Sequence, residues 1–150
     1  MPTDLRRAAG EAAVERALRW LVERDPASVE PTSGADGPNL AFNLVILTHL
    51  VGTPYMPDLS GRVLMIEEVA EHMYRIDRDL CQLAMSEGFA RLKGLRLGRC
   101  SDIPPNDPDF VLNEEEVARF WCERTGVPYL GRADIGHDAA NKVEIGRAHV

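Results

Sequence analysis

The chain has 150 residues, of which 45% are hydrophobic, and this length and composition suit one globular domain with a buried core. Its 17 basic and 24 acidic residues give a net charge of −7, and the basic residues form no stripe, so we expect no nucleic-acid partner. No apolar run approaches the roughly 20 residues of a membrane span, and the N-terminal residues lack a signal peptide's apolar core. We therefore expect a cytoplasmic protein with no membrane partner.

The N-terminal third of the chain predicts two helices separated by a loop. Residues 5–25 place four apolar side chains at helical spacing, which indicates an amphipathic helix. Residues 26–38 are rich in Pro, Ser, Gly and Asp and predict a loop or linker. Asn39 is expected to cap a second, mostly apolar helix through residues 42–50, which a turn-rich connection over 51–61 follows.

From residue 63 onward, the period of the apolar residues alternates between that of strands and that of helices. This order is typical of an α/β fold, with a mostly parallel or mixed sheet flanked by helices. Asn113 and Gly126 are expected to begin and end the last helix. The predicted strands are residues 63–68, 94–100 and 128–135, and the predicted helices are residues 74–92 and 114–125.

Two adjacent carboxylates, Glu67 and Glu68, follow the apolar strand 63–66. Because an unpaired buried charge is costly, we expect the pair to mark the point where the strand emerges from the core. The last predicted strand delivers His137, after Gly136, to the same edge of the sheet, where ligands of parallel sheets bind. A carboxylate that orients a histidine leaves the second ring nitrogen free to accept a proton from a nucleophile. No serine lies in a G-x-S-x-G elbow, so ordinary polar strand ends remain the alternative.

Neither the cysteines nor the nearest acidic and histidine residues indicate a metal site. Cys81, Cys100 and Cys122 form no CxxC pair and are expected to be reduced thiols. Glu68 and His72 lie four residues apart, but no further ligand is spaced to complete a site, so we predict no metal.

Several short motifs occur along the chain in a specific order. They are GPNL at 37–40, GTPY at 52–55, IEE at 66–68, YRIDR at 74–78, GLRLGRCSD at 94–102 and ADIGHDAAN at 133–141. In this order they resemble the C-terminal domain of the LD-carboxypeptidases. That family comprises serine peptidases of bacterial murein recycling and is related to the microcin C immunity peptidases.

The resemblance implies a Ser-Glu-His triad in which a separate N-terminal domain supplies the serine and the oxyanion hole. By motif position, Glu67 is the orienting carboxylate and His137 is the general base. The implied reaction releases the terminal D-Ala of a murein tetrapeptide and needs no cofactor. The chain alone, which lacks the nucleophile domain, is expected to be inactive.

Three residues are candidates for binding the peptide substrate: Glu68 of the acidic pair, and Tyr74 and Arg75 a few residues after it. An arginine at this position can hold a carboxylate by two parallel hydrogen bonds. An ordinary ion pair between Arg75 and a neighbouring acidic side chain is the alternative.

The same resemblance divides the chain into four parts. Residues 1–25 are expected to be the last helix of the N-terminal domain, 26–38 a linker and 39–143 the C-terminal domain. Residues 144–150 are expected to be a non-native tail, because IGRAHV reads like a translated sequencing adapter; a native short C-terminus is the alternative. Without the family's final strand an apolar edge would stay uncovered, and we expect a homodimer.

Two other functions remain open at this point. One is a peptide-binding or dimerisation module without catalysis. The other is the sister activity, cleavage of an acylated aminoacyl nucleotide as in the microcin C immunity peptidases.

Overall fold

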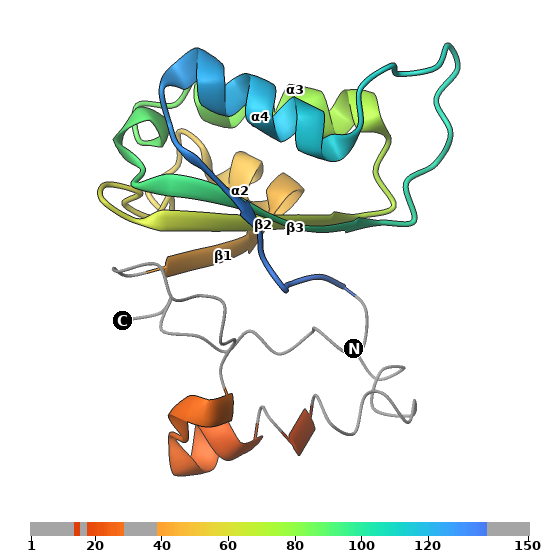
Figure 1. The fold of residues 1–150 in the computed structure, drawn as a ribbon. Helices are drawn as coiled ribbons and strands as arrows, with labels where there is room; N and C mark the ends of the chain where they lie inside the picture. The colour runs from red at the N-terminus through yellow and green to blue at the C-terminus, as the bar shows by residue number, and fades with distance from the viewer. Residues whose placement is uncertain (1–13, 16–17, 29–38, 138–150) are drawn as a thin grey trace.

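A four-stranded parallel sheet in the order β1-β2-β3-β4 is the centre of the fold (Figure 1). The computed structural model describes residues 14–15, 18–28 and 39–137. The strands are β1 (Asn39–Asn43), β2 (Val63–Val69), β3 (Gly94–Ser101) and β4 (Tyr129–Arg132). The helices that connect them are α2 (Leu44–Leu50), α3 (Met73–Ala84) and α4 (Glu114–Thr125). The predicted α/β class with a largely parallel sheet is confirmed.

The main core lies between one face of the sheet and the three helices. Alternate side chains of a strand point to opposite faces, so one set from each strand meets the helices. In Figure 1, α3 and α4 lie side by side over this face, and α2 lies on the same side. The buried residues of this core include Leu40, Leu64, Ile66, Leu95 and Leu97 from the strands and Leu47, Ile76, Leu80, Leu83 and Val117 from the helices.

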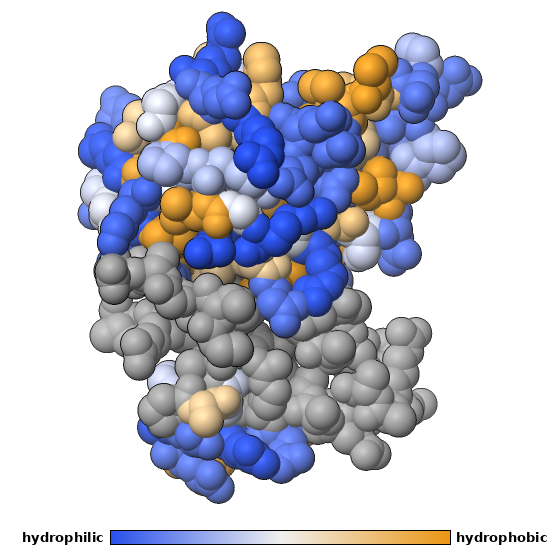
Figure 2. Space-filling model, viewed as in Figure 1, coloured by the Kyte–Doolittle hydropathy of each residue, from blue (hydrophilic) through white to orange (hydrophobic). Residues whose placement is uncertain are grey.

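The surface seen in Figure 2 is mostly hydrophilic, with a few separate apolar patches. Val111, Leu112 and Phe120, near and within α4, are among the exposed large hydrophobic residues. Within the described part of the chain, no helix is long and apolar enough to cross a membrane.

The prediction that Asn39 caps a helix is wrong, because residues 39–43 form strand β1. These residues pair in parallel with β2, from Asn39 opposite Val63 to Asn43 opposite Glu67. The cap of α2 is Asn43, whose side-chain oxygen accepts a hydrogen bond from the Ile46 amide at 3.1 Å. The predicted helix is confirmed from Leu44 to Leu50, whereas the first two residues of its predicted range, Phe42 and Asn43, belong to β1.

Other predicted boundaries are also corrected. Helix α3 ends at Ala84, and the buried Phe89 lies in a separate 3-10 turn, Phe89–Arg91. Strand β4 has four residues instead of the eight expected over 128–135. Much of the first predicted helix lies outside the described residues, and its described part includes a π-helix, Arg19–Glu23. The expected tail, residues 144–150, also lies outside the described residues.

The predicted ends of α4 are confirmed. The Asn113 side chain accepts hydrogen bonds from the Glu115 and Glu116 amides at 3.0 Å, and the Glu116 carboxylate accepts from the Asn113 amide at 2.8 Å. Gly126 ends the helix at φ 74°, in the left-handed region that favours glycine.

Replacing Asn113 with Ala should lower the free energy of unfolding by about 1 kcal/mol, because two helix amides lose their acceptor. Urea denaturation of the purified chain measures this change. Asn113→Ser, which keeps a side-chain acceptor, should lose much less; equal losses for the two variants would contradict the role of the cap.

Candidate active site

Glu67 and Glu68, at the end of β2, point to opposite faces of the sheet. Glu68 follows the alternation of Leu64 and Ile66 and lies on the helix side, whereas Glu67 follows Met65 and lies on the other side. The expectation that the pair marks the strand's emergence from the core is wrong, since Glu67 is 8% and Glu68 3% exposed. Each carboxylate is instead held by polar partners within the fold, as a buried charge requires.

The Glu68 carboxylate accepts three hydrogen bonds. Its Oε1 accepts from Asn43 Nδ2 at 2.8 Å and from the Val69 amide at 2.9 Å, and its Oε2 accepts from the Val45 amide at 3.0 Å. These donors belong to the end of β1, the start of α2 and β2 itself. The Glu68 carboxylate therefore joins three elements.

The Glu67 carboxylate contacts His137, which lies 70 residues further along the chain. The distance between His137 Nδ1 and Glu67 Oε2 is 2.5 Å, which places the two groups in direct hydrogen-bonding contact. The His137 side chain is 44% exposed, and among the described residues its Nε2 has no hydrogen-bond partner. The pair thus joins a buried carboxylate to a partly exposed imidazole.

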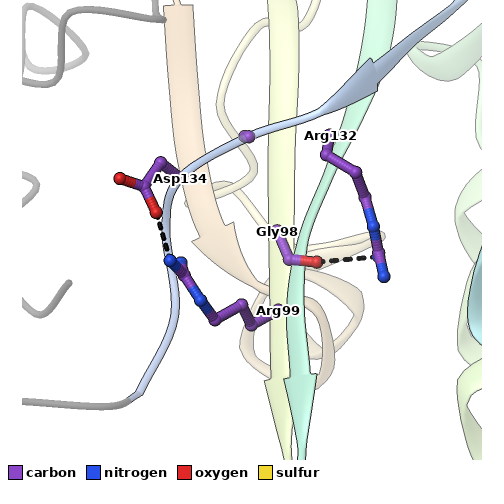
Figure 3. Close-up of a pocket in the computed structure, with 5 residues that line it drawn as sticks. Gly98, Arg99, Arg132 and Asp134 are labelled. Atoms are coloured by element: carbon purple, nitrogen blue, oxygen red, sulfur yellow. Dashed lines mark hydrogen bonds and ion pairs between the residues drawn. The ribbon is translucent and has the colours of Figure 1, made fainter. Parts of the chain in front are cut away.

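His137 reaches Glu67 because residues 133–137, here called the crossing segment, leave β4 and cross the sheet on the face opposite the helices (Figures 1 and 3). The Ala133 amide donates to Leu97 O at 2.9 Å, and the Arg99 amide donates to Ile135 O at 2.8 Å. The Ala133 and Ile135 side chains pack with Met65 in a second, smaller core.

Gly98 in β3 makes this crossing possible. A Cβ atom at this position would lie 2.5 Å from Ile135 Cγ1, 2.8 Å from Ile135 O and 3.0 Å from Glu67 Cβ. The pairing register also changes here, because Ile66 is opposite Leu97 and Glu68 is opposite Cys100. The sequence analysis did not identify Gly98 as a site residue, although a glycine inside a strand is a signal for close backbone approach.

A shallow cavity of about 360 Å³ lies beside the crossing segment (Figure 3). Arg99 and Asp134 form an ion pair on one side of Gly98. On the other side, Arg132 Nη1 donates to Gly98 O at 3.2 Å, and its Nη2 lies 2.8 Å from the Glu114 carboxylate. The cavity walls are therefore charged groups that already have partners.

The candidate substrate-binding residues Tyr74 and Arg75 lie at the start of α3. Arg75 donates to the Tyr74 hydroxyl at 3.0 Å and pairs with Glu71 at 3.2 Å, which is the kind of local ion pair considered as the alternative. The Tyr74 ring, 45% exposed, stacks with His72 at a centroid distance of 5.5 Å. A role in substrate binding stays a prediction for these residues.

The described residues hold no group of three or more His, Cys, Asp or Glu side chains that is able to bind a metal ion. All three cysteines are free thiols, as expected. Burial, aided by the nearby negative charge of Glu114, raises the pKa of Cys100 to about 12, and burial raises the pKa of Cys122 to about 11. Both thiols are therefore protonated near neutral pH and are poor nucleophiles.

This geometry defines a class of protein. It is a parallel α/β domain in which a carboxylate near the end of one strand meets a histidine from the segment that follows another strand. The model of the LD-carboxypeptidase C-terminal domain family matches residues 36–147, and the chain belongs to that family. The match includes residues 144–147 of the expected tail, whose origin stays a prediction.

Known relatives support this membership. A Synechocystis protein named as a carboxypeptidase is 34% identical over 111 residues, which are 73% of this chain and 36% of that protein. The murein tetrapeptide carboxypeptidase of Pseudomonas aeruginosa is 29% identical, over 91% of this chain and 45% of its own. The structure of the muramoyltetrapeptide carboxypeptidase from Oxalobacter formigenes superposes with a TM-score of 0.63 at 33% identity, covering 70% of this chain and 37% of that one. The chain thus spans between a third and a half of the length of these relatives.

Replacing Gly98 with Ala should destabilise the chain by about 1–3 kcal/mol, because the added methyl group overlaps the crossing segment. Thermal and urea denaturation measure the loss. Gly88→Ala is the matched control, since a Cβ there would meet Leu59 at an ordinary 3.5 Å. Equal stability of the two variants would show that the crossing segment gives way easily.

Glu68→Gln should cost about 1–3 kcal/mol of stability, because an amide NH2 would face at least one of the three donors that Glu68 now accepts from. Glu67→Gln should cost less, since its remaining carbonyl oxygen is able to accept from His137 Nδ1. Urea denaturation near neutral pH compares the two variants, and the reverse order would contradict the assigned contacts.

Proposed function

We propose that this chain is the C-terminal part of a serine LD-carboxypeptidase that releases the terminal D-Ala of a murein tetrapeptide. In this proposal the chain supplies the Glu and His of a Ser-Glu-His triad, and an N-terminal domain outside the chain supplies the serine and the oxyanion hole. The observation that carries the proposal is the 2.5 Å contact between Glu67 and His137, together with membership of the family.

The pair has the properties that a general base needs. Glu67 accepts a hydrogen bond from the Nδ1–H of His137 and thereby fixes the tautomer in which the lone pair of His137 is on Nε2. When a serine hydroxyl attacks the peptide carbonyl, Nε2 takes its proton, and the buried carboxylate stabilises the resulting imidazolium. The same proton then passes to the departing D-Ala amine. Water, activated in the same way, hydrolyses the acyl-enzyme.

The position of His137 suits a nucleophile that comes from another domain. Its side chain is 44% exposed, whereas the side chain of Glu67 is 10% exposed, so the histidine is the member of the pair that a partner reaches more easily. Glu68 takes no part in proton transfer in this proposal, because three donors already engage its carboxylate. The cytoplasmic location, the homodimer and the division of the chain at residues 26–38 belong to the same proposal.

The test is made on the longer protein, with the coding region upstream of this chain included. Glu67→Gln should lower kcat for D-Ala release from murein tetrapeptide by up to about 10⁴, if Glu67 acts like the orienting carboxylate of a serine protease. His137→Ala should cost at least as much. Glu68→Gln is the control and should cost far less activity per folded molecule, although it costs more stability. Reversed severities of the two Glu variants would contradict the roles assigned here.

The 150-residue chain alone should release no D-Ala, because a base without a nucleophile and oxyanion donors lacks most of the acyl-transfer machinery. Clear release by the chain alone would contradict the proposal. Peptide binding without hydrolysis by the longer protein would indicate a binding module, and cleavage of an acylated aminoacyl nucleotide in place of the tetrapeptide would indicate the sister activity.

A further inference from the structure

Arg99 makes several contacts with the residues that directly precede His137. Its amide donates to Ile135 O at 2.8 Å, and its guanidinium donates to the same oxygen through Nη1 at 3.5 Å. The second terminal nitrogen of the guanidinium forms the ion pair with Asp134 that Figure 3 shows. One arginine thus holds both the side chain of Asp134 and the main chain one residue further on.

Gly136 completes this arrangement. A Cβ at position 136 would lie 3.1 Å from Arg99 Cβ, so the chain passes directly over the stem of the arginine. The next residue is His137, whose ring contacts Glu67. Only Gly136 therefore separates Ile135, which Arg99 binds, from His137. Gly136 itself packs against the side chain of Arg99.

The place of Arg99 in β3 also brings its contacts with Asp134 and Ile135 close to Glu67. The register shift puts the two residues Gly98 and Arg99 between the pairs Ile66–Leu97 and Glu68–Cys100, opposite the single residue Glu67. Such bulges commonly re-aim side chains next to active sites. One short piece of β3 thus lies against Glu67 at Gly98 and against the residues that precede His137 at Arg99.

The contacts of the Arg99 side chain are expected to fix the local geometry of the crossing segment more than to stabilise the whole fold. The side chains of Arg99 and Asp134 are 41% and 54% exposed. Ion pairs this exposed contribute little to the free energy of unfolding, because water screens them and two long side chains lose freedom. A residue that contributes little to stability and holds the segment ahead of a proposed base is expected to act on the position of that base.

We propose that Arg99 is a positioning residue: through Asp134 and Ile135 O it sets the place of the His137 imidazole against Glu67. This inference rests on the proposed function for its consequence in catalysis, but the placement of the ring is testable without any activity. The planar fork of arginine suits the role, since it reaches a carboxylate and a carbonyl oxygen at once, which a lysine ammonium does less well.

The first experiment is proton NMR of the 150-residue chain with labelled histidines. The Nδ1–H···Oε2 bond should give a far-downfield Nδ1–H signal, assigned to His137 by its loss in His137→Ala and by its upfield shift in Glu67→Gln, where a neutral amide oxygen replaces the carboxylate. Arg99→Ala should remove this signal or make its proton exchange rapidly with water, while the thermal midpoint changes little. Arg99→Lys should give an intermediate exchange rate. Arg91→Ala is the matched control, because this arginine bonds Ser60 and should leave the signal unchanged.

Asp134→Asn removes the ion pair with Arg99 at nearly constant side-chain volume. If Arg99→Ala does not fold, this variant tests whether the ion pair positions His137. It should also increase the exchange rate of the His137 signal. A signal with the position and exchange rate of the unsubstituted chain, in whichever of these two variants folds, would overturn the proposal. Absence of the signal in the unsubstituted chain would overturn it as well.

The second experiment uses the longer protein. Arg99→Ala should lower kcat on the order of 10²-fold with KM nearly unchanged, as expected when a reacting group is misplaced by about 1 Å. An unchanged kcat would overturn the catalytic part of the proposal. If the longer protein has no peptidase activity at all, the proposed function fails, and the NMR result still decides whether Arg99 positions His137.

Discussion

Two carboxylates are buried next to each other at the end of β2, and the arrangement of this end of the sheet follows from how each charge is satisfied. A buried carboxylate without hydrogen bonds would cost several kcal/mol. Glu68 meets this requirement on the helix side with donors from β1, α2 and β2, and Glu67 meets it on the opposite side with a histidine from beyond β4. Because the alternation of the strand separates the two side chains, adjacent residues of the same type have different environments and different proposed roles.

The sequence predicted the class of fold because apolar periodicity and capping residues are local signals. The strand 63–68, the strand 94–100 and the capped helix 114–125 need only their own residues to be recognised. β1 was missed for the opposite reason. Its five residues are a strand because β2 lies beside them, and a single sequence does not show its neighbours in space.

The candidate site divides in the same way. Glu67 and His137 were identified from strand-end position and from family resemblance, both of which are visible along the chain. The bulge at Gly98 and Arg99 was not identified, because its importance lies in contacts with residues more than 30 positions away in the sequence. The burial of the acidic pair was also mispredicted, since the donors that allow it come from Asn43, Val45 and His137.

The separation of 70 residues between Glu67 and His137 has a consequence for the order of folding. Parallel strands pair only after a long connection has closed, and closing each connection costs chain entropy before any contact is gained. The crossing segment pairs with β3, which must first lie beside β2, so the Glu67–His137 contact belongs among the last native contacts to form. Because the crossing segment pairs with β3, and β3 pairs with β2, the proton-accepting pair exists only in molecules whose sheet is complete.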